Sequence, residues 1–348
     1  MEPSLALQSH LEQLWQSQKP FVVFGLPESE EVQLYFQEDH TLHTTKTLNE
    51  SGFVLAPFDS EAPTYFISDT FQKKFFYPKQ QKQSRSEITF PEATTEKVSF
   101  IQLVEKALDG IKNKAYKKVV VSRKIKYQSS KSPIAVFMDL LGDYNEAMVY
   151  LWRHPQGVCW LGASPEKFLK KTEERVQTEA LAGTQVFQIN TIPVWKHKEI
   201  EEQELVVEQI RQDLSPFFTT EETIEHPPRN VRAGNLVHRS SLFELPKFQK
   251  PLHLLAEALH PTPAVGGIPK AEAIEFIKAE EGYNRSLYTG YFGPISKNNA
   301  HLFVNLRCAS YELGAFNLYV GAGITSGSHP EKEWEETQQK AQTIAKVL

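Results

Sequence analysis

Predicted strands follow one another along this sequence, and most neighbouring strands have no helix between them. Short apolar runs bounded by turn residues fall at 146–153, 157–162, 166–170, 174–181, 285–295, 300–311 and 315–321. A doubly wound parallel sheet would need a helix in the crossover between neighbouring strands. The order of elements therefore favours an α+β fold in which helices flank large antiparallel sheets.

Helices are predicted where apolar residues recur every three or four positions. Such stretches fall at 98–111, 198–214, 251–259, 270–281 and from Pro330 to the C-terminus, and residues 1–20 resemble a more polar amphipathic helix. Between residues 21 and 76, short apolar pieces alternate with turn residues, which indicates further strands. Residues 77–96 are polar and contain prolines, so we expect a surface excursion or linker there.

The charge balance and the cysteine count exclude several classes of protein. Lysine and arginine number 38 against 43 aspartate and glutamate, a net charge of −5, so a nucleic-acid partner is not expected. Cys159 and Cys308 are too few for a disulfide framework or a cysteine-rich zinc site. We find no signal-peptide pattern and no apolar run of about 20 residues. We therefore expect a cytoplasmic protein with no membrane partner, and since nothing demands an oligomer, a monomer.

Two predicted helices carry acidic residues at a spacing that places them on one face. Glu199 and Glu202 lie three residues apart in the first helix, and Glu333, Glu336 and Lys340 share a face of the last. Carboxylates brought together from two helices provide the oxygen ligands that Mg²⁺ prefers. Spacing alone, however, favours a solvated acidic face.

Four other positions combine a polar or flexible residue with an apolar setting. Gly183 and Gly323 are each expected to end a predicted strand, where a backbone N–H could approach an anion or simply form a tight turn. Arg307 is predicted inside a strand, where a buried guanidinium needs a carboxylate partner from the protein or a ligand. Lys118 begins a predicted strand, which ordinarily means a solvated lysine.

Glu166 follows Pro165 in a turn, where an exposed carboxylate is the ordinary interpretation.

The familiar motifs of other enzyme classes are missing from the sequence. It contains no HExxH, no GxGxxG, no phosphate-binding loop with its lysine and no GxSxG. Zinc hydrolysis, dinucleotide binding and serine hydrolysis therefore have no support.

Taken together, eight stretches resemble the chorismate-utilising enzymes, and within them the isochorismate synthases. In family order they are KVVVSR (118–123), GASPEKFL (162–169), EALAGT (179–184), KEIEEQELV (198–206), LHPTPAVGG (259–267), RSLYTGYFG (285–293), LFVNLRCASYE (302–312) and GAGITSGSHPEKEWEETQQKA (321–341). The resemblance implies one domain with large antiparallel sheets flanked by helices and the site between them. It covers about residues 98–348, so we expect a catalytic region at 97–348 and a variable part of the same fold at 1–96.

The resemblance also implies a role for each matching residue. Lys118 matches the lysine that activates water, and Glu166 matches the general acid. Glu202 and Glu336 match the direct Mg²⁺ ligands, supported by Glu199 and Glu333 through the waters of the metal. Positions that match those holding the carboxylates and hydroxyl of chorismate are Gly183, Thr184, Tyr288, Arg307, Gly323 and Lys340. The chain departs from the family where Gln203 follows Glu202, a place often held by histidine.

Within the family, two positions favour adding water rather than ammonia. Members that aminate chorismate typically have glutamine at the position of Lys118 and threonine at the position of Ala264. We therefore expect a Mg²⁺-dependent isochorismate synthase acting on the small molecule chorismate. Salicylate synthases share Lys118 and Glu166 and then eliminate pyruvate, so they remain the main alternative. Two further alternatives are an aminating enzyme similar to anthranilate or aminodeoxychorismate synthase and a non-catalytic binding protein. The non-catalytic protein should have lost acidic residues from the two helices.

Overall fold

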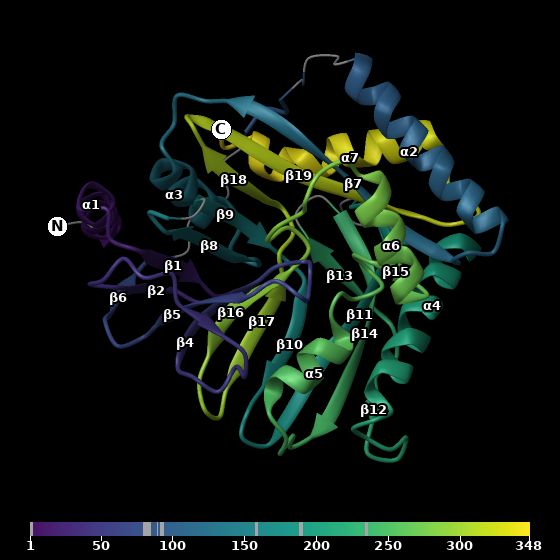
Figure 1. Cartoon of the computed structure of the whole chain (residues 1–348), viewed down its shortest axis with the longest axis horizontal. Helices are drawn as coiled ribbons and strands as arrows, with labels where there is room; N and C mark the ends of the chain where they lie inside the picture. The colour runs from purple at the N-terminus through teal and green to yellow at the C-terminus, as the bar shows by residue number, and fades with distance from the viewer. Residues whose placement is uncertain are drawn as a thin grey trace.

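Two antiparallel sheets lie face to face, and helices cover their outer sides (Figure 1). The computed structural model describes residues 3–78, 85–88, 90, 94–156, 159–187, 191–233 and 236–348. Every strand pairing among these residues is antiparallel. The predicted α+β class, with large antiparallel sheets and flanking helices, is thus confirmed.

The first sheet has nine strands among the described residues, and its order mixes early and late parts of the chain. From edge to edge the strands are β15 (Gly267–Ile268), β7 (Lys118–Gln128), β19 (Ala315–Ile324), β18 (Cys308–Glu312), β9 (Cys159–Ser164), β8 (Met148–Arg153), β1 (Phe21–Gly25), β2 (Glu31–Phe36) and β6 (Gln72–Phe76). The long pairing of β7 with β19 brings the residues around Lys118 against the strand that precedes the last helix.

The second sheet has ten strands in the described part of the chain. Its order is β12 (Ile224–Glu225), β14 (Leu236–Pro246), β11 (Arg175–Val186), β10 (Lys167–Lys171), β17 (Ala300–Val304), β16 (Tyr291–Ile295), β4 (Gly52–Ala56), β5 (Thr64–Ser68) and β3 (Thr44–Thr45), with β13 (Arg229–Ala233) paired to β14. Residues 21–76 therefore contribute strands to both sheets.

Alternating side chains show how the sheets share their cores. Along β1, Phe21 and Val23 pack under the helices on the outer face, whereas Val22 and Phe24 pack between the two sheets. The side chains of a strand alternate between its faces, and both faces of β1 are apolar, so the strand is buried on both sides. The layer between the sheets is rich in aromatic residues, including Phe292 from the second sheet.

Seven helices are present among the described residues, and each covers the sheets from outside (Figure 1). They are α1 (Pro3–Gln16), α2 (Thr94–Lys112), α3 (Pro133–Asp143), α4 (His197–Leu214), α5 (Leu252–Leu259), α6 (Lys270–Glu280) and α7 (Pro330–Ala345). Pro330 opens α7, because proline lacks the N–H that the first helical turn leaves unpaired. None of the described helices has the length and apolar character needed to span a bilayer.

Three predictions about strands are wrong, for one physical reason. The run 300–311 is two strands, β17 and β18, with Arg307 between them in a left-handed conformation (φ 48°). Residues 285–290 form turns, so only Tyr291–Ile295 of the run 285–295 is a strand. Gly183 and Gly323 lie inside β11 and β19 and do not end them. Apolar alternation does not reveal where a chain leaves one sheet for the other or where a bulge interrupts it.

Much of the expected linker at 77–96 lies outside the described residues, namely 79–84, 89 and 91–93. The described part of this segment contacts the last helix. The backbone N–H of Ile88 donates to Gln342 Oε1 at 2.9 Å, and Gln342 Nε2 donates back to the Ile88 carbonyl at 2.8 Å. Arg85 forms ion pairs with Asp139 and Asp143 of α3. This segment therefore joins α7 to α3 over the outer face of the first sheet.

Candidate active site

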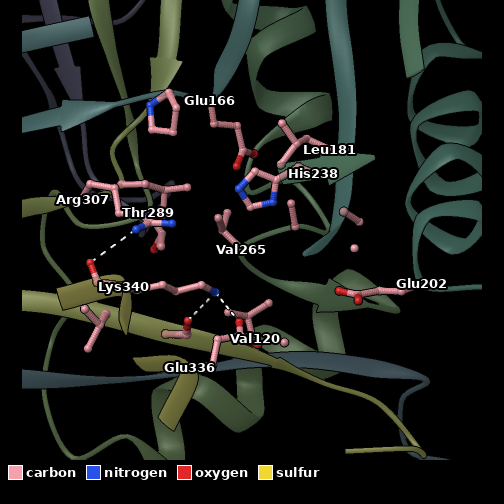
Figure 2. A pocket seen from close by; sticks show the side chains of 18 of the residues that line it. Val120, Glu166, Leu181, Glu202, His238, Val265, Thr289, Arg307, Glu336 and Lys340 are labelled. Carbon is pink, nitrogen blue, oxygen red and sulfur yellow. Dashed lines mark hydrogen bonds and ion pairs between the residues drawn. The ribbon is translucent and has the colours of Figure 1, made fainter. Parts of the chain in front are cut away.

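One cavity of about 150 Å³ collects almost all the residues singled out from the sequence. Its lining includes Lys118, Glu166, Gly183, Glu199, Glu202, Tyr288, Arg307, Gly323, Glu333, Glu336 and Lys340. Figure 2 shows the labelled side chains pointing into this space from several strands and from the last helix. Thr184 lies in β11, but its side chain is outside what the structure describes. Residues far apart in the sequence therefore meet in one place.

Lys118 is buried, which contradicts the ordinary expectation for a lysine at the start of a strand. Only 1% of the residue is exposed, and its Nζ donates to Glu202 Oε1 at 2.9 Å. The pairing of Val119 and Val120 with β19 holds the strand start in place. A Cβ on Gly323 would lie 3.3 Å from both Glu202 Oε1 and Lys118 Cε, so glycine at this position leaves room for the pair.

Glu166 lies where the chain crosses from the first sheet to the second, in the turn between β9 and β10. The turn is held by Ser164 Oγ, which donates to the Val304 carbonyl at 2.5 Å, and by the Val304 N–H, which donates to the Glu166 carbonyl at 3.0 Å. The residue is 6% exposed. Burial raises the pKa of its carboxyl to about 7, although Lys118 and Lys340 act in the opposite direction. Glu166 can therefore hold a proton near neutral pH.

Arg307 occupies another crossing between the sheets, after β17 and before β18. Its Nη1 donates to Thr343 Oγ1 at 3.1 Å and to the Lys340 carbonyl at 3.4 Å, which directs the guanidinium along α7. Lys340 Nζ donates to the Gly321 carbonyl at 2.9 Å and pairs with Glu336 at 2.6 Å (Figure 2). Two cations thus line the cavity on the α7 side, where they can hold anionic groups of a ligand.

The acidic residues reach the cavity from α4 and α7. Glu333 is buried, with 5% exposure, so this part of α7 is not a solvated acidic face. Glu199 Oε2 accepts from the Lys196 backbone N–H at 2.9 Å and so also closes the first turn of α4. Gly183 lies beneath this turn at a bulge of β11 with φ 71°, and a Cβ there would come within 3.2 Å of Glu199.

Carboxylate oxygens are the donors that suit Mg²⁺, and four glutamates from α4 and α7 line this one cavity. As the side chains lie, however, no three metal-binding groups in the described residues are close enough together to hold an ion. Glu202 is paired with Lys118 and Glu336 with Lys340. The donor set therefore fits a hard cation provided that these carboxylates turn from the lysines toward it.

His238 also lines the cavity, although no motif in the sequence pointed to it. It lies on β14, a strand for which no prediction was made. Burial, with smaller contributions from the nearby cations Arg307 and Lys340, lowers the pKa of the imidazole to about 3. A neutral imidazole can donate or accept a hydrogen bond to a ligand. Its sequence, LVHRSSLFEL, does not alternate between polar and apolar residues, so it lacks the period of two that indicates a strand.

Comparison with known proteins agrees with this geometry. A family model described as chorismate binding enzyme matches residues 9–348. The chain is 32% identical over 266 residues to isochorismate synthase MenF of Escherichia coli K12, covering 73% of this chain and 61% of MenF. It is 30% identical over 315 residues to isochorismate synthase EntC of the same strain, covering 84% of this chain and 79% of EntC.

The solved structure of the menaquinone-specific isochorismate synthase MenF from E. coli superposes with a TM-score of 0.79 at 22% identity. That superposition covers 94% of this chain and 88% of the solved chain. The chain spans about three fifths of the length of the curated MenF it matches.

Proposed function

Because this chain belongs to the chorismate-binding enzyme family, we propose that it is an isochorismate synthase, an isomerase that moves the hydroxyl of chorismate from C4 to C2. The observation that carries the proposal is the single cavity that contains Lys118, Glu166 and both acidic helices. A base, an acid and a set of hard oxygen ligands are what the reaction requires. Two curated relatives, MenF and EntC, are named for this activity.

In the proposed reaction, water attacks C2 while the C4 hydroxyl departs and the ring double bond shifts. Lys118 Nζ takes a proton from the attacking water, so it must be neutral when it acts. Glu166 gives its proton to the leaving oxygen, so that oxygen departs as water. The raised pKa of Glu166 supports this assignment, because its carboxyl keeps a proton near neutral pH. The two residues act from opposite faces of the ring.

The carboxylates of chorismate would be held mainly by cations and small residues. Arg307, with Tyr288 nearby, receives the enolpyruvyl carboxylate through charge-assisted hydrogen bonds. Lys340 lies on the same side of the cavity. Gly183, Thr184 and Gly323 contribute backbone or hydroxyl groups to the same ligand in this proposal. Neither Lys118 nor Glu166 is assigned a binding role.

We propose Mg²⁺ as the cofactor, held directly by Glu202 and Glu336 and supported by Glu199 and Glu333 through bound waters. When bound, the ion would withdraw charge from the ring carboxylate and fix its orientation. Glu202 and Glu336 must leave their lysine partners to bind it, which would free Lys118 Nζ and Lys340 Nζ to face the substrate. The carboxylate lining and the chemistry of hard cations support this assignment.

The identity of the product tests the proposed function. With pure protein, chorismate and Mg²⁺, we expect isochorismate by NMR and little pyruvate in a coupled lactate dehydrogenase assay. Adding ammonium should give no aminated product, because Lys118 stands where aminating members have glutamine. Stoichiometric pyruvate would instead make the protein a salicylate synthase. A chain that binds chorismate and never consumes it would be a non-catalytic member.

A further inference from the structure

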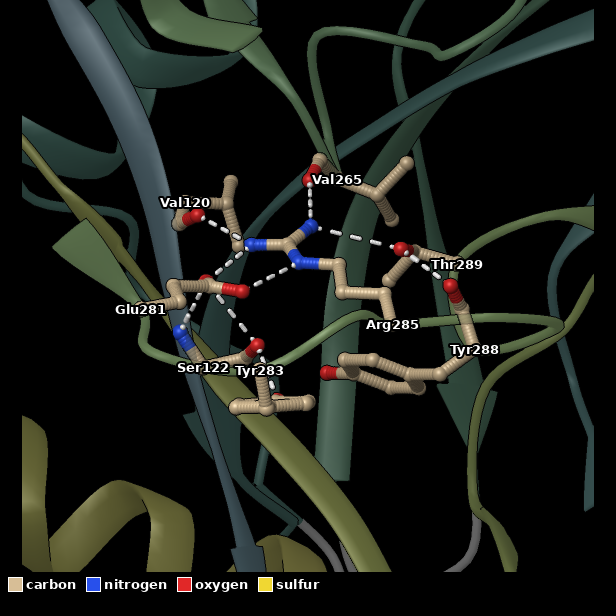
Figure 3. Close-up of polar contacts among 8 residues, drawn as sticks. All are labelled: Val120, Ser122, Val265, Glu281, Tyr283, Arg285, Tyr288 and Thr289. Carbon is tan, nitrogen blue, oxygen red and sulfur yellow. Dashed lines mark hydrogen bonds and ion pairs between the residues drawn. The ribbon is translucent and has the colours of Figure 1, made fainter. Parts of the chain in front are cut away.

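A buried ion pair lies directly behind one wall of the cavity, and no proposed step of the reaction uses it. Arg285 and Glu281 have side chains that are 1% and 0% exposed, and their charged groups contact each other (Figure 3). Arg285 follows α6 in the segment RSLYTGYFG, and Glu281 comes directly after α6. Neither residue is among those that line the cavity.

The guanidinium uses its donors on four different partners. Besides Glu281, Arg285 donates from Nη2 to the Val120 carbonyl at 2.7 Å and from Nη1 to the Val265 carbonyl at 2.9 Å. Nη1 also donates to Thr289 Oγ1 at 3.2 Å. An arginine has five N–H donors in a fixed planar fork, so one side chain can hold several groups in a set relation.

The carboxylate completes the arrangement from the other side. Glu281 Oε1 accepts from the backbone N–H of Ser122 at 2.7 Å and from Ser122 Oγ at 2.9 Å, and Ser122 Oγ also contacts the Tyr283 hydroxyl at 2.6 Å. The short strand β15 pairs with β7 only at Lys118 and Val119. Beyond that point the ion pair supplies partners to the outer edge of β7, where backbone groups would otherwise be unpaired.

Three groups held by Arg285 belong to the cavity wall. Val120, Val265 and Thr289 all line the cavity, and each comes from a different segment of the chain. Side chains two positions apart point to the same face of a strand, so Val120 continues the face of β7 that begins with Lys118. The position of Val120 therefore determines where Lys118 lies relative to Val265 and Thr289 on the facing segments.

We propose that Arg285 is a positioning residue for the isomerisation, which it supports by holding β7, and with it Lys118, at a set place beside the substrate. The inference rests on the proposed function. Arg285 acts through the backbone of Val120 and touches no reacting atom. Glu281 balances the charge of the buried guanidinium and, by accepting hydrogen bonds from Ser122, holds the next part of β7. Small displacements of a catalytic group lower the reaction rate by large factors. Losing the contacts of Arg285 should therefore slow the reaction by shifting Lys118.

The test is Arg285→Lys, which keeps a cation beside Glu281 and removes the planar fork. A lysine cannot reach Val120, Val265 and Thr289 together, because its donors lie on one atom. We expect kcat to fall by about 10- to 100-fold, with the chorismate KM changed by less than about threefold. The KM should hold because Arg307 and Lys340, the proposed carboxylate anchors, make no contact with the ion pair.

A double variant, Glu281→Gln with Arg285→Gln, keeps the test falsifiable if the lysine variant does not fold. It removes both buried charges together and should show the same split between kcat and KM. Tyr283→Phe is the matched control, because it removes one hydrogen bond on the far side of Ser122 and should leave kcat within about twofold. All rates are measured well below the melting temperature of each variant.

A folded lysine variant with wild-type kcat would overturn the inference and reduce the pair to a structural role, as would kcat and KM that change by the same factor. These results concern Arg285 alone. A wild-type protein that leaves chorismate unchanged would remove the proposed function, and this inference with it.

Discussion

Replacing Glu166 by glutamine is expected to lower turnover by a factor of about 10²–10⁴ while making the folded protein more stable at pH 8. The loss of turnover follows because glutamine cannot give a proton to the leaving oxygen. The chorismate KM should change little, since Glu166 is not assigned to any carboxylate of the substrate. Steady-state kinetics in both directions should show the same loss, because the reverse reaction uses the same residue as a base.

The gain in stability follows from the sign of the pKa shift. Burial raises the pKa of the Glu166 carboxyl from 4.5 to about 7 in the folded protein. Between those values the folded state binds more protons than the unfolded state, so the wild-type protein loses stability as the pH rises. At about 1.4 kcal/mol per pH unit, the loss reaches about 3 kcal/mol above pH 7. Glutamine does not titrate and avoids it.

Urea unfolding of the metal-free proteins at pH 5 and pH 8 measures this difference. The gap in unfolding free energy between the variant and wild type should be larger at pH 8 than at pH 5. Equal gaps at the two pH values would contradict the buried, protonated carboxyl. Wild-type turnover in the variant would leave the acid unassigned and return Glu166 to a structural turn.

Lys118→Ala should lower turnover by a similar factor, again with little effect on substrate binding. If both residues act in one concerted step, the double variant should be little worse than the poorer single variant. Arg307→Ala offers the contrast, since it removes a proposed carboxylate anchor and should raise KM. An Arg307→Ala protein with unchanged KM would argue against that anchor.

Glu202→Gln and Glu336→Gln are each expected to remove most of the Mg²⁺-dependent activity. Each change replaces a charged oxygen ligand with a neutral amide, and the affinity of hard-cation sites depends on ligand charge. Titrating Mg²⁺ against the initial rate should show a lower maximum and a higher concentration for half activation.

The same helices provide matched controls for this experiment. Glu201 and Glu335 are exposed neighbours of the two proposed ligands and do not line the cavity. Glu201→Gln and Glu335→Gln should therefore keep the wild-type rate and Mg²⁺ dependence. Near-normal behaviour of Glu202→Gln or Glu336→Gln would refute the assignment of α4 and α7 as a metal site.

Local sequence signals predicted the elements of this fold better than their connections. Pro330 predicted the start of α7, and the apolar runs predicted β8 to β11, because both signals depend only on neighbouring residues. Arg307 was wrongly expected inside a strand. The crossing between sheets depends on partners such as Gly290, whose carbonyl accepts from the Asn305 N–H at 2.7 Å. Such distant contacts leave no periodic signal.

The site shows the same limit at the level of single residues. Nothing local distinguishes Lys118 from an exposed lysine. Its burial depends on α4, where Glu202 lies 84 residues further along the chain, and on β19, where Ile324 pairs with Val119. Its role came from the family resemblance, which also supplied the substrate. The acidic spacing in the two helices is compatible with a metal site, but it is also compatible with a solvated acidic face. His238 escaped because its strand was not predicted.

The central claim, that water adds at C2 as the C4 hydroxyl leaves, is tested most directly by running the reaction in H₂¹⁸O with Mg²⁺. The isochorismate formed should carry one ¹⁸O atom, located at the C2 hydroxyl by mass spectrometry and by the isotope shift in its ¹³C NMR spectrum. Chorismate recovered as the reaction approaches equilibrium should gain the label at C4. Isochorismate free of label, or chorismate left unconsumed by the wild-type protein, would contradict the account.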